Sequence, residues 1–250
     1  MKRAELLNTL DELLKPETFK DYCPNGLQIE GADNVQRIVC GVSASEALID
    51  EAIRRGADTI IVHHGYFWEN ENSRIIGIKR NRIAKILANN INLIAYHLPL
   101  DANETVGNNY EMARALKLQN VRATKSNPLV LMGEFHDFVT TEELANKIEG
   151  VVHRPPFVVP VDSVALIKTV AFCSGAAQDF LEDAAAEGSD AYLSGEISER
   201  TVLEARELGI PYFSVGHHAG ETLGIRAMAV WIGNHFPEIN VSFVGIDNPV

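Results

Sequence analysis

The chain repeats one order of strands and helices twice, and this repeat limits its possible folds more than any other feature. Three predicted strands and two predicted helices alternate in the first half, at residues 37–42, 45–56, 59–64, 79–90 and 91–97. The second half shows the same order, at residues 168–173, 177–188, 191–196, 198–209 and 210–218. Such alternation favours an α/β fold with mixed, mostly parallel sheets and helices on both faces.

The two halves also match in register. A shift of 132 lays residues 38–64 on residues 170–196 without a gap, so that Asp58 falls on Asp190. Any α/β protein repeats a strand and then a helix, so chance similarity is the alternative. We predict two similar repeats, residues 1–126 and 127–250, which meet near the sequence KSNPLV. The sequence VVHRPPFVVP in the second repeat is typical of an edge strand because of its prolines.

A second match places polar residues at equivalent points. His97-x-x-x-Asp101 follows one predicted strand, and at a shift of 120 it corresponds to His217-x-x-x-Glu221 after another. His217 and Glu221 are spaced so that both can lie on one face of a helix. His218 is an alternative to His217, but the match to His97 favours His217.

Charge and cysteine content narrow the function classes. The formal net charge is −12, which disfavours general nucleic-acid binding through a basic face. The three cysteines are far apart and form no C-x-x-C pair, so we expect buried free thiols. Acidic residues interrupt any signal-peptide core near the N-terminus, and no 18-residue apolar run is present. We therefore expect a cytoplasmic, soluble protein.

Histidines and carboxylates gather where predicted strands end. His63 and His64 end a predicted strand just before Gly65, which allows a sharp turn that can bring adjacent imidazoles near each other. Ligands bind at the carboxyl ends of parallel strands. Imidazole and carboxylate ligands suit zinc, iron or manganese, and two ions roughly 3.5–4 Å apart would use both histidines. The candidate metal ligands are His63, His64, Asp101, His217 and Glu221.

Each candidate also has a structural explanation. His63 or His64 alone is most simply a buried histidine, Asp101 a helix cap, and Glu221 an acid that favours a first helical turn. His97 is either a ligand or a residue that orients Asp101 or a substrate, and Glu196 either lines the site or caps the next helix. We assign His97 and Glu196 as the candidate catalytic residues. The other histidines have no partners in sequence and are assigned structural roles: His136, His153 and His235.

Motifs for several common enzyme classes are missing. The sequence contains no G-x-x-x-x-G-K-[ST], no strand-linked G-x-G-x-x-G and no G-x-S-x-G. Classical ATP and dinucleotide sites and a serine hydrolase are therefore disfavoured. The sequence SGAAQ, which follows the predicted strand at 168–173, could receive an anion at a helix N-terminus.

Five sequences spread along the chain resemble one known family. They are PNGLQIEG, GADTIIVHHGYFW, YHLPLDAN, YLSGEIS and GHHAGETLGIRA, and the resemblance is to the GTP cyclohydrolase 1 type 2 homologue family, also called NGG-interacting-factor-like. It implies two intertwined α/β repeats, a dinuclear metal site between them and a toroidal homohexamer. It also implies that His64 and Asp101 hold one metal, that His63 and His217 hold the other, and that Glu221 bridges them. The chain departs from many relatives at Gly220, where a hydroxyl residue is usual, and in CSGAAQ, which is poorer in glycine.

Three hypotheses for function follow. The first is a dinuclear metal-dependent hydrolase that acts on a small substrate, a nucleotide or related heterocycle, as a GTP cyclohydrolase does. The second is a non-enzymatic metal-binding ring that binds partners or delivers metal. The third is a dinuclear phosphoesterase. Release of formate from GTP marks the first, and release of phosphate marks the third.

Overall fold

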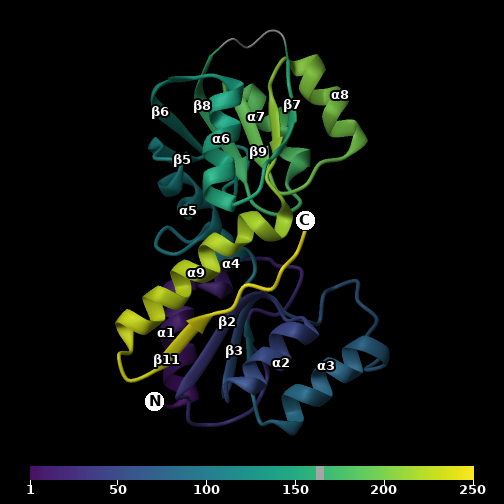
Figure 1. Cartoon of the computed structure of the whole chain (residues 1–250), viewed down its shortest axis with the longest axis vertical. Helices are drawn as coiled ribbons and strands as arrows, with labels where there is room; N and C mark the ends of the chain where they lie inside the picture. The colour runs from purple at the N-terminus through teal and green to yellow at the C-terminus, as the bar shows by residue number, and fades with distance from the viewer. Residues whose placement is uncertain (162–165) are drawn as a thin grey trace. The chain divides into compact units, whose positions relative to one another are not determined.

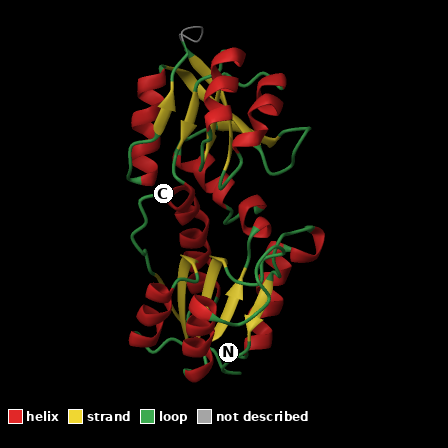
Figure 2. Ribbon diagram, turned by 90° about the vertical axis from the view of Figure 1, so that its right-hand side faces the viewer, coloured by secondary structure: helices red, strands yellow, loops and turns green. Residues whose placement is uncertain are grey.

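A computed structural model describes residues 1–161 and 166–250, which form two compact units. The first unit contains residues 1–107 and 224–247, and the second contains residues 108–223 and 248–250. The chain thus returns to the first unit after building the second, which makes the two repeats intertwined. The predicted boundary between the two sequence repeats, at residues 126 and 127, is a different division from that between the units, and it stays a prediction. Within each unit, helices flank a sheet (Figure 1, Figure 2).

The first unit has a five-stranded sheet of order β1-β4-β3-β2-β11. Its strands are β1 (Gly26–Ile29), β2 (Arg37–Ser43), β3 (Thr59–His64), β4 (Asn92–Ala95) and β11 (Asn240–Phe243). All neighbours are parallel except β1, which runs antiparallel to β4. The carboxyl ends of β2, β3 and β4 therefore meet at one edge.

Helices cover both faces of this sheet because side chains along each strand alternate between faces. On one face, Cys40 and Ile61 pack against α1 (Arg3–Leu14) and the later part of α9 (His217–His235). On the other face, Val39 and Ile60 pack against α2 and α3. Helix α2 spans Glu46–Arg54 and α3 spans Gly77–Ala88, while the short η1 (Pro16–Thr18) and α4 (Leu98–Ala102) follow α1 and β4.

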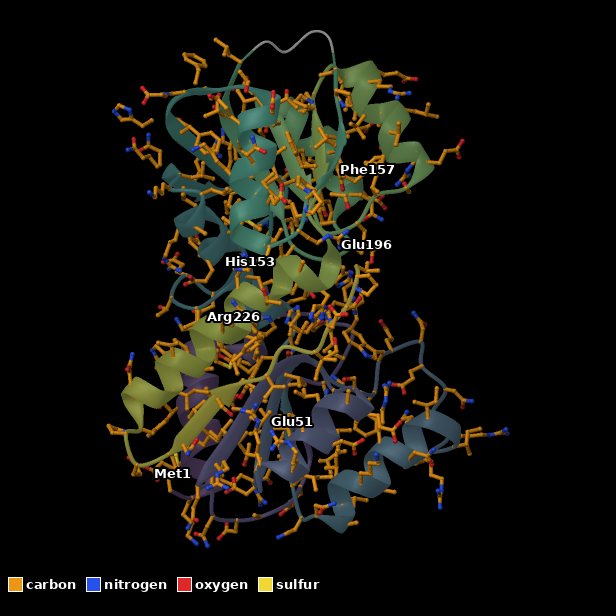
Figure 3. The ribbon with its side chains drawn as sticks, in the orientation of Figure 1. Met1, Glu51, His153, Phe157, Glu196 and Arg226 are labelled. Atoms are coloured by element: carbon orange, nitrogen blue, oxygen red, sulfur yellow. The ribbon has the colours of Figure 1, made fainter. Side chains whose placement is uncertain are left out.

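The second unit has a six-stranded sheet of order β5-β6-β8-β9-β10-β7. Its strands are β5 (Gln119–Ala123), β6 (Leu131–Val139), β7 (Phe157–Val159), β8 (Ile167–Cys173), β9 (Ala191–Ser194) and β10 (Tyr212–Ser214). Strands β8, β9 and β10 are parallel, and the remaining pairs are antiparallel. Strand β7 lies at an edge, as its flanking prolines predict, and Phe157 on it is exposed (Figure 3).

The helices of the second unit also divide between the two faces. Met112 of α5 and Leu144 of α6 pack with Val170 of β8, whereas Leu181 of α7 and Ala205 of α8 pack on the opposite face. These helices, with the short η2, are α5 (Asn108–Ala115), α6 (Thr141–Val152), η2 (Gln178–Phe180), α7 (Leu181–Ala186) and α8 (Glu199–Leu208). Thr140 begins α6 with a complete capping box.

The two units share the strand register that the shift of 132 predicts. Ile38 of β2 lies opposite Thr59 of β3, and Val170 of β8 lies opposite Ala191 of β9, which is the same register after the shift of 132. Matched aspartates also precede the second strand of each pair. Asp58 Oδ2 accepts hydrogen bonds from the backbone N–H groups of residues 36 and 37, and Asp190 Oδ2 accepts from those of residues 168 and 169.

Some predicted element bounds differ from the structure. The turn-rich sequence YCPNGLQIEG contains strand β1, the predicted helix 177–188 is divided into η2 and α7, and the predicted strand 210–218 ends at Ser214. His217 therefore begins a helix instead of ending a strand. Cys23, Cys40 and Cys173 are free and buried, which confirms that expectation. Among the described helices, none combines the length and apolar character that a membrane span requires.

Candidate metal centre

In the first unit, His63 and His64 are the last two residues of β3. Their imidazole centroids lie 4.5 Å apart with a tilt of 41° between the ring planes. The two side chains therefore do not diverge as regular strand neighbours would. His63 is fully buried, and His64 is partly exposed with its Nδ1 3.1 Å from the Ser43 hydroxyl oxygen. The two imidazoles thus lie close together, although Gly65 is not among the glycines with a positive φ.

The turn after His64 is held by Gln28, which the sequence did not single out. The Gln28 Oε1 accepts a 2.7 Å hydrogen bond from the Tyr66 backbone N–H, and its Nε2 donates to the Tyr66 carbonyl at 3.1 Å. A Cβ added at Gly65 would lie 2.1 Å from that same Oε1. Gly65 is therefore required because the Gln28 amide fills the space beside it.

His63 has one ring nitrogen engaged and one directed at a carboxylate. Its Nδ1 lies 3.0 Å from the Tyr96 carbonyl oxygen, and since a carbonyl only accepts, Nδ1 carries the proton. The Nε2 atom faces Asp101 Oδ1 at 3.6 Å. An imidazole nitrogen and a carboxylate oxygen at this distance can both bind one metal ion. The donor set therefore fits a metal.

The structure places Asp101 Oδ1 beside His63 Nε2. The assignment of Asp101 and His64 to one metal, which the family resemblance implies, stays a prediction. Asp101 lies in the first turn of α4 and is buried. The Asp101 backbone N–H donates to the His97 carbonyl. This hydrogen bond holds Asp101 close to the end of β4.

His97 is held by two residues that the sequence pattern missed, Asp21 and Asn25. The His97 Nδ1 donates to Asp21 Oδ1 at 2.7 Å, and Asn25 Oδ1 accepts from the His97 backbone N–H at 2.8 Å. Asp21 Oδ2 also accepts from Asn25 Nδ2 and from the Leu98 backbone. Burial acts to raise the pKa of Asp21, but the hydrogen bonds from His97 and Asn25 outweigh it, so the pKa lies below its usual value.

These bonds direct His97 toward the histidine pair. With Nδ1 bonded to Asp21, the Nε2 atom is the one left for the site. The His97 ring centroid lies 5.2 Å from that of His63 and 5.7 Å from that of His64. One nitrogen from each of the three rings lies within 4.8 Å of the others, a spacing compatible with metal ligation. Cys23 lies nearby, and burial and the Asp21 charge raise the pKa of its thiol to about 12.

In the second unit, His217 and Glu221 form a pair on the first turns of α9. His217 Nε2 lies 3.2 Å from Glu221 Oε1, and its Nδ1 lies 2.7 Å from Glu196 Oε1 (Figure 3 labels Glu196). The hydrogen bond with the buried Glu221 is the main cause that raises the pKa of His217 to about 9; burial opposes it, and Glu196 supports it. A metal ion that binds Nε2 must therefore displace a proton.

Two glycines make room for this pair. Gly175 follows β8 with a φ of +71°, and a Cβ added there would lie 2.9 Å from Glu221 Oε1. A Cβ at Gly195 would lie 2.6 Å from the Gly175 carbonyl oxygen and 2.8 Å from His217 Cα. The backbone after β8 and β9 thus closely approaches both candidate ligands. The sequences CSGAAQ and SGE contain these glycines, but only the geometry shows their purpose.

The structure therefore brings together the predicted residues of each unit as two sets. The first set is His63, His64, His97 and Asp101, and the second is Glu196, His217 and Glu221. Glu196 contacts His217, while Ser198 caps α8. The backbone N–H of His218 donates to the Val250 carbonyl, and His217 is the histidine that belongs to the second set.

The three histidines assigned structural roles lie elsewhere. His136 is exposed beside Asp137, His153 ends α6, and His235 stacks on Trp231.

The chain is similar to known proteins along its whole length. Residues 1–249 match the family model described as Duf34/NIF3 (NGG1p interacting factor 3). The chain belongs to this family. A relative in Vibrio cholerae serotype O1, called "GTP cyclohydrolase 1 type 2 homolog", is 48% identical over 254 residues, with both chains fully covered. A relative with the same name in Escherichia coli K12 is 45% identical over 249 residues, again with full coverage.

A solved structure supports the fold. The structure described as "protein ybgI, unknown function" matches with a TM-score of 0.96 at 46% identity, and all of both chains is covered. The family resemblance drawn from the sequence motifs is therefore confirmed, as is the α/β fold. Within this family fold, groups of buried histidine, aspartate and glutamate side chains could hold metal ions.

Proposed function

We propose that the protein is a dinuclear metal-dependent hydrolase that acts on a nucleotide or a related heterocycle. One observation carries the proposal. In each unit, a histidine has its Nδ1 engaged by an oxygen acceptor and its Nε2 facing a carboxylate oxygen, at 3.6 Å for His63 and Asp101 and 3.2 Å for His217 and Glu221. Metal-ligating histidines are typically oriented by such a hydrogen bond on the other nitrogen.

The proposed ligands are His63, His64, Asp101, His217 and Glu221. The first three belong to the first unit, and the last two belong to the second. The mixture of imidazole and carboxylate suits zinc, iron or manganese. When bound, such ions activate water near neutral pH and attract an anionic substrate.

The remaining polar residues have separate proposed roles. Asp21 fixes the tautomer of His97, so that His97 Nε2 can accept or return a proton during hydrolysis. Glu196 orients His217 through Nδ1, and its partly exposed carboxylate is the second candidate for proton transfer. These catalytic roles extend the sequence prediction for His97 and Glu196.

Substrate, assembly and location complete the proposal. The name shared by the relatives supports a nucleotide-type small molecule, with GTP as the first substrate to test. We also propose a toroidal homohexamer in the cytoplasm, as the sequence resemblance implies. Neither a membrane nor a nucleic acid is a proposed partner, since the net charge is −12.

The experiment is metal analysis followed by a product assay. The purified protein is reconstituted separately with zinc, iron and manganese and is then incubated with GTP. We expect two ions per chain and formate release, with both lost in His64→Ala and retained in the exposed control His136→Ala. Phosphate release would support the phosphoesterase instead. Bound metal with turnover of neither kind would support the non-enzymatic ring.

A further inference from the structure

Two aromatic side chains of the first unit flank the candidate histidines without belonging to either ligand set. They are Trp68, in the loop after β3, and Tyr22, in the segment that precedes β1. The Trp68 ring lies 4.9 Å from the His97 ring at 84°, and 5.9 Å from the His64 ring. The Tyr22 ring lies 6.4 Å from the His97 ring at 62°. His97 is therefore contacted by both aromatic rings.

The loop that carries Trp68 is held in an unusual conformation. Phe67 has a φ of +66°, a left-handed conformation that bulky residues rarely adopt and that is often found at functional sites. The Trp68 backbone N–H donates to Glu71 Oε2 at 3.0 Å, and the indole Nε1 donates to the Gly65 carbonyl at 3.2 Å. The one polar atom of the indole is thus bonded within the loop, and the side chain is partly exposed.

Tyr22 is exposed although its backbone is firmly held. The residue is 60% exposed. Its backbone N–H donates to Asp21 Oδ1 at 2.6 Å, and its carbonyl accepts from the Glu69 N–H at 2.7 Å. The Asp21 carboxylate that fixes His97 therefore also fixes Tyr22, and the Glu69 bond connects Tyr22 to the loop of Trp68.

We propose that Tyr22 and Trp68 form a stacking subsite for a planar heteroaromatic ring, such as a purine base, next to the candidate histidines. Aromatic side chains bind bases through their flat faces, and this contact is largely independent of the base. A ring seated there adjoins His64 and His97, the residues proposed to bind metal and to move a proton. This inference rests on the proposed function and names the part of the substrate that the first unit recognises.

The chain offers a direct optical test because it has two tryptophans, Trp68 and Trp231. Trp231 lies in α9, where it stacks on His235 at 4.6 Å. The variant Trp231→Phe leaves Trp68 as the only tryptophan in the full chain. The probes are guanosine 5′-monophosphate, which has a base, and ribose 5-phosphate, which lacks one.

We expect guanosine 5′-monophosphate to quench Trp68 fluorescence saturably, and ribose 5-phosphate to leave it unchanged. In calorimetry, Trp68→Ala should weaken binding of guanosine 5′-monophosphate on the order of tenfold or more, since stacking on one aromatic ring contributes about that much. Tyr22→Ala should weaken it to a smaller extent. Trp68→Phe should restore most of the affinity, and Trp231→Phe should not change it.

Equal binding in wild type and Trp68→Ala would overturn the proposal, as would equal quenching by both probes or no binding of the nucleotide. The product assay is independent of this test. Quenching without turnover of GTP would support the stacking subsite while contradicting the hydrolase. Turnover with an unchanged KM in Trp68→Ala would support the hydrolase while contradicting the subsite.

Discussion

Replacing Gly175 by alanine should weaken metal binding at Glu221 without unfolding the protein. Gly175 has a φ of +71°, and its new Cβ would lie 2.9 Å from Glu221 Oε1. An ordinary contact begins at 3.4 Å, so the carboxylate or the loop must move by about half an ångström. Displacements of about this size disrupt a bound constellation. We expect metal affinity to fall about 10- to 100-fold, as when a residue that supports a ligand is lost.

A matched control separates this effect from backbone strain. Gly188 also has a left-handed φ, +87°, but a Cβ there meets nothing within 4 Å. Alanine in a left-handed conformation costs about 1–2 kcal/mol at either position. Gly175→Ala and Gly188→Ala should therefore lower the free energy of unfolding by similar amounts.

The assay combines urea unfolding, followed by circular dichroism, with competition for metal against a chelator. The reasoning predicts similar losses of stability and a loss of metal in Gly175→Ala alone. If Gly188→Ala loses metal to the same extent, or if Gly175→Ala keeps the affinity of wild type, then the glycine does not act through Glu221.

Three further predictions concern side chains that form hydrogen bonds with backbone groups or with His97. Gln28→Ala leaves the Tyr66 backbone groups without their partner, so the free energy of unfolding should fall by about 1–3 kcal/mol in urea titration, and no change would show that water replaces the amide. Asp58→Ala and Asp190→Ala each leave two backbone N–H groups without their acceptor, at equivalent points of the repeat. Calorimetry should therefore show similar decreases in the free energy of unfolding. A large difference between the two variants would contradict the equivalence of the two aspartates. Asp21→Ala should allow His97 to exchange between tautomers, and nitrogen NMR of labelled histidine detects this exchange. The control Asp11→Ala removes the hydrogen-bond partner of Tyr96 and should leave the His97 signals unchanged. Identical His97 signals in both variants would contradict the role of Asp21.

The local sequence predicts the repeat well because its signals lie close together along the chain. Strand, helix and strand alternate within about 30 residues, and Asp58 and Asp190 occupy the same point in each copy. The same holds for the candidate ligands: a histidine or carboxylate at the end of an apolar strand stands out from its neighbours. His63, His64, His97 and His217 were visible for that reason.

The remaining site residues could not be predicted because their partners are distant in sequence. Asp21 lies 76 residues before His97 in a segment without periodicity, and Gln28 lies 38 residues before Tyr66. The role of Gly175 depends on where a Cβ would lie relative to Glu221, which only coordinates provide. Strand β1 was missed because a proline and an asparagine precede it and a glycine begins it, and these residues indicate a turn.

The central claim is that His63, His64, Asp101, His217 and Glu221 ligate a pair of divalent ions. Inductively coupled plasma mass spectrometry of the reconstituted protein tests it most directly, with Asp101→Asn representing the first unit and Glu221→Gln the second. The account predicts two ions per chain in wild type and fewer than one in either variant. Two ions retained in either variant, or fewer than one ion in wild type, would contradict it.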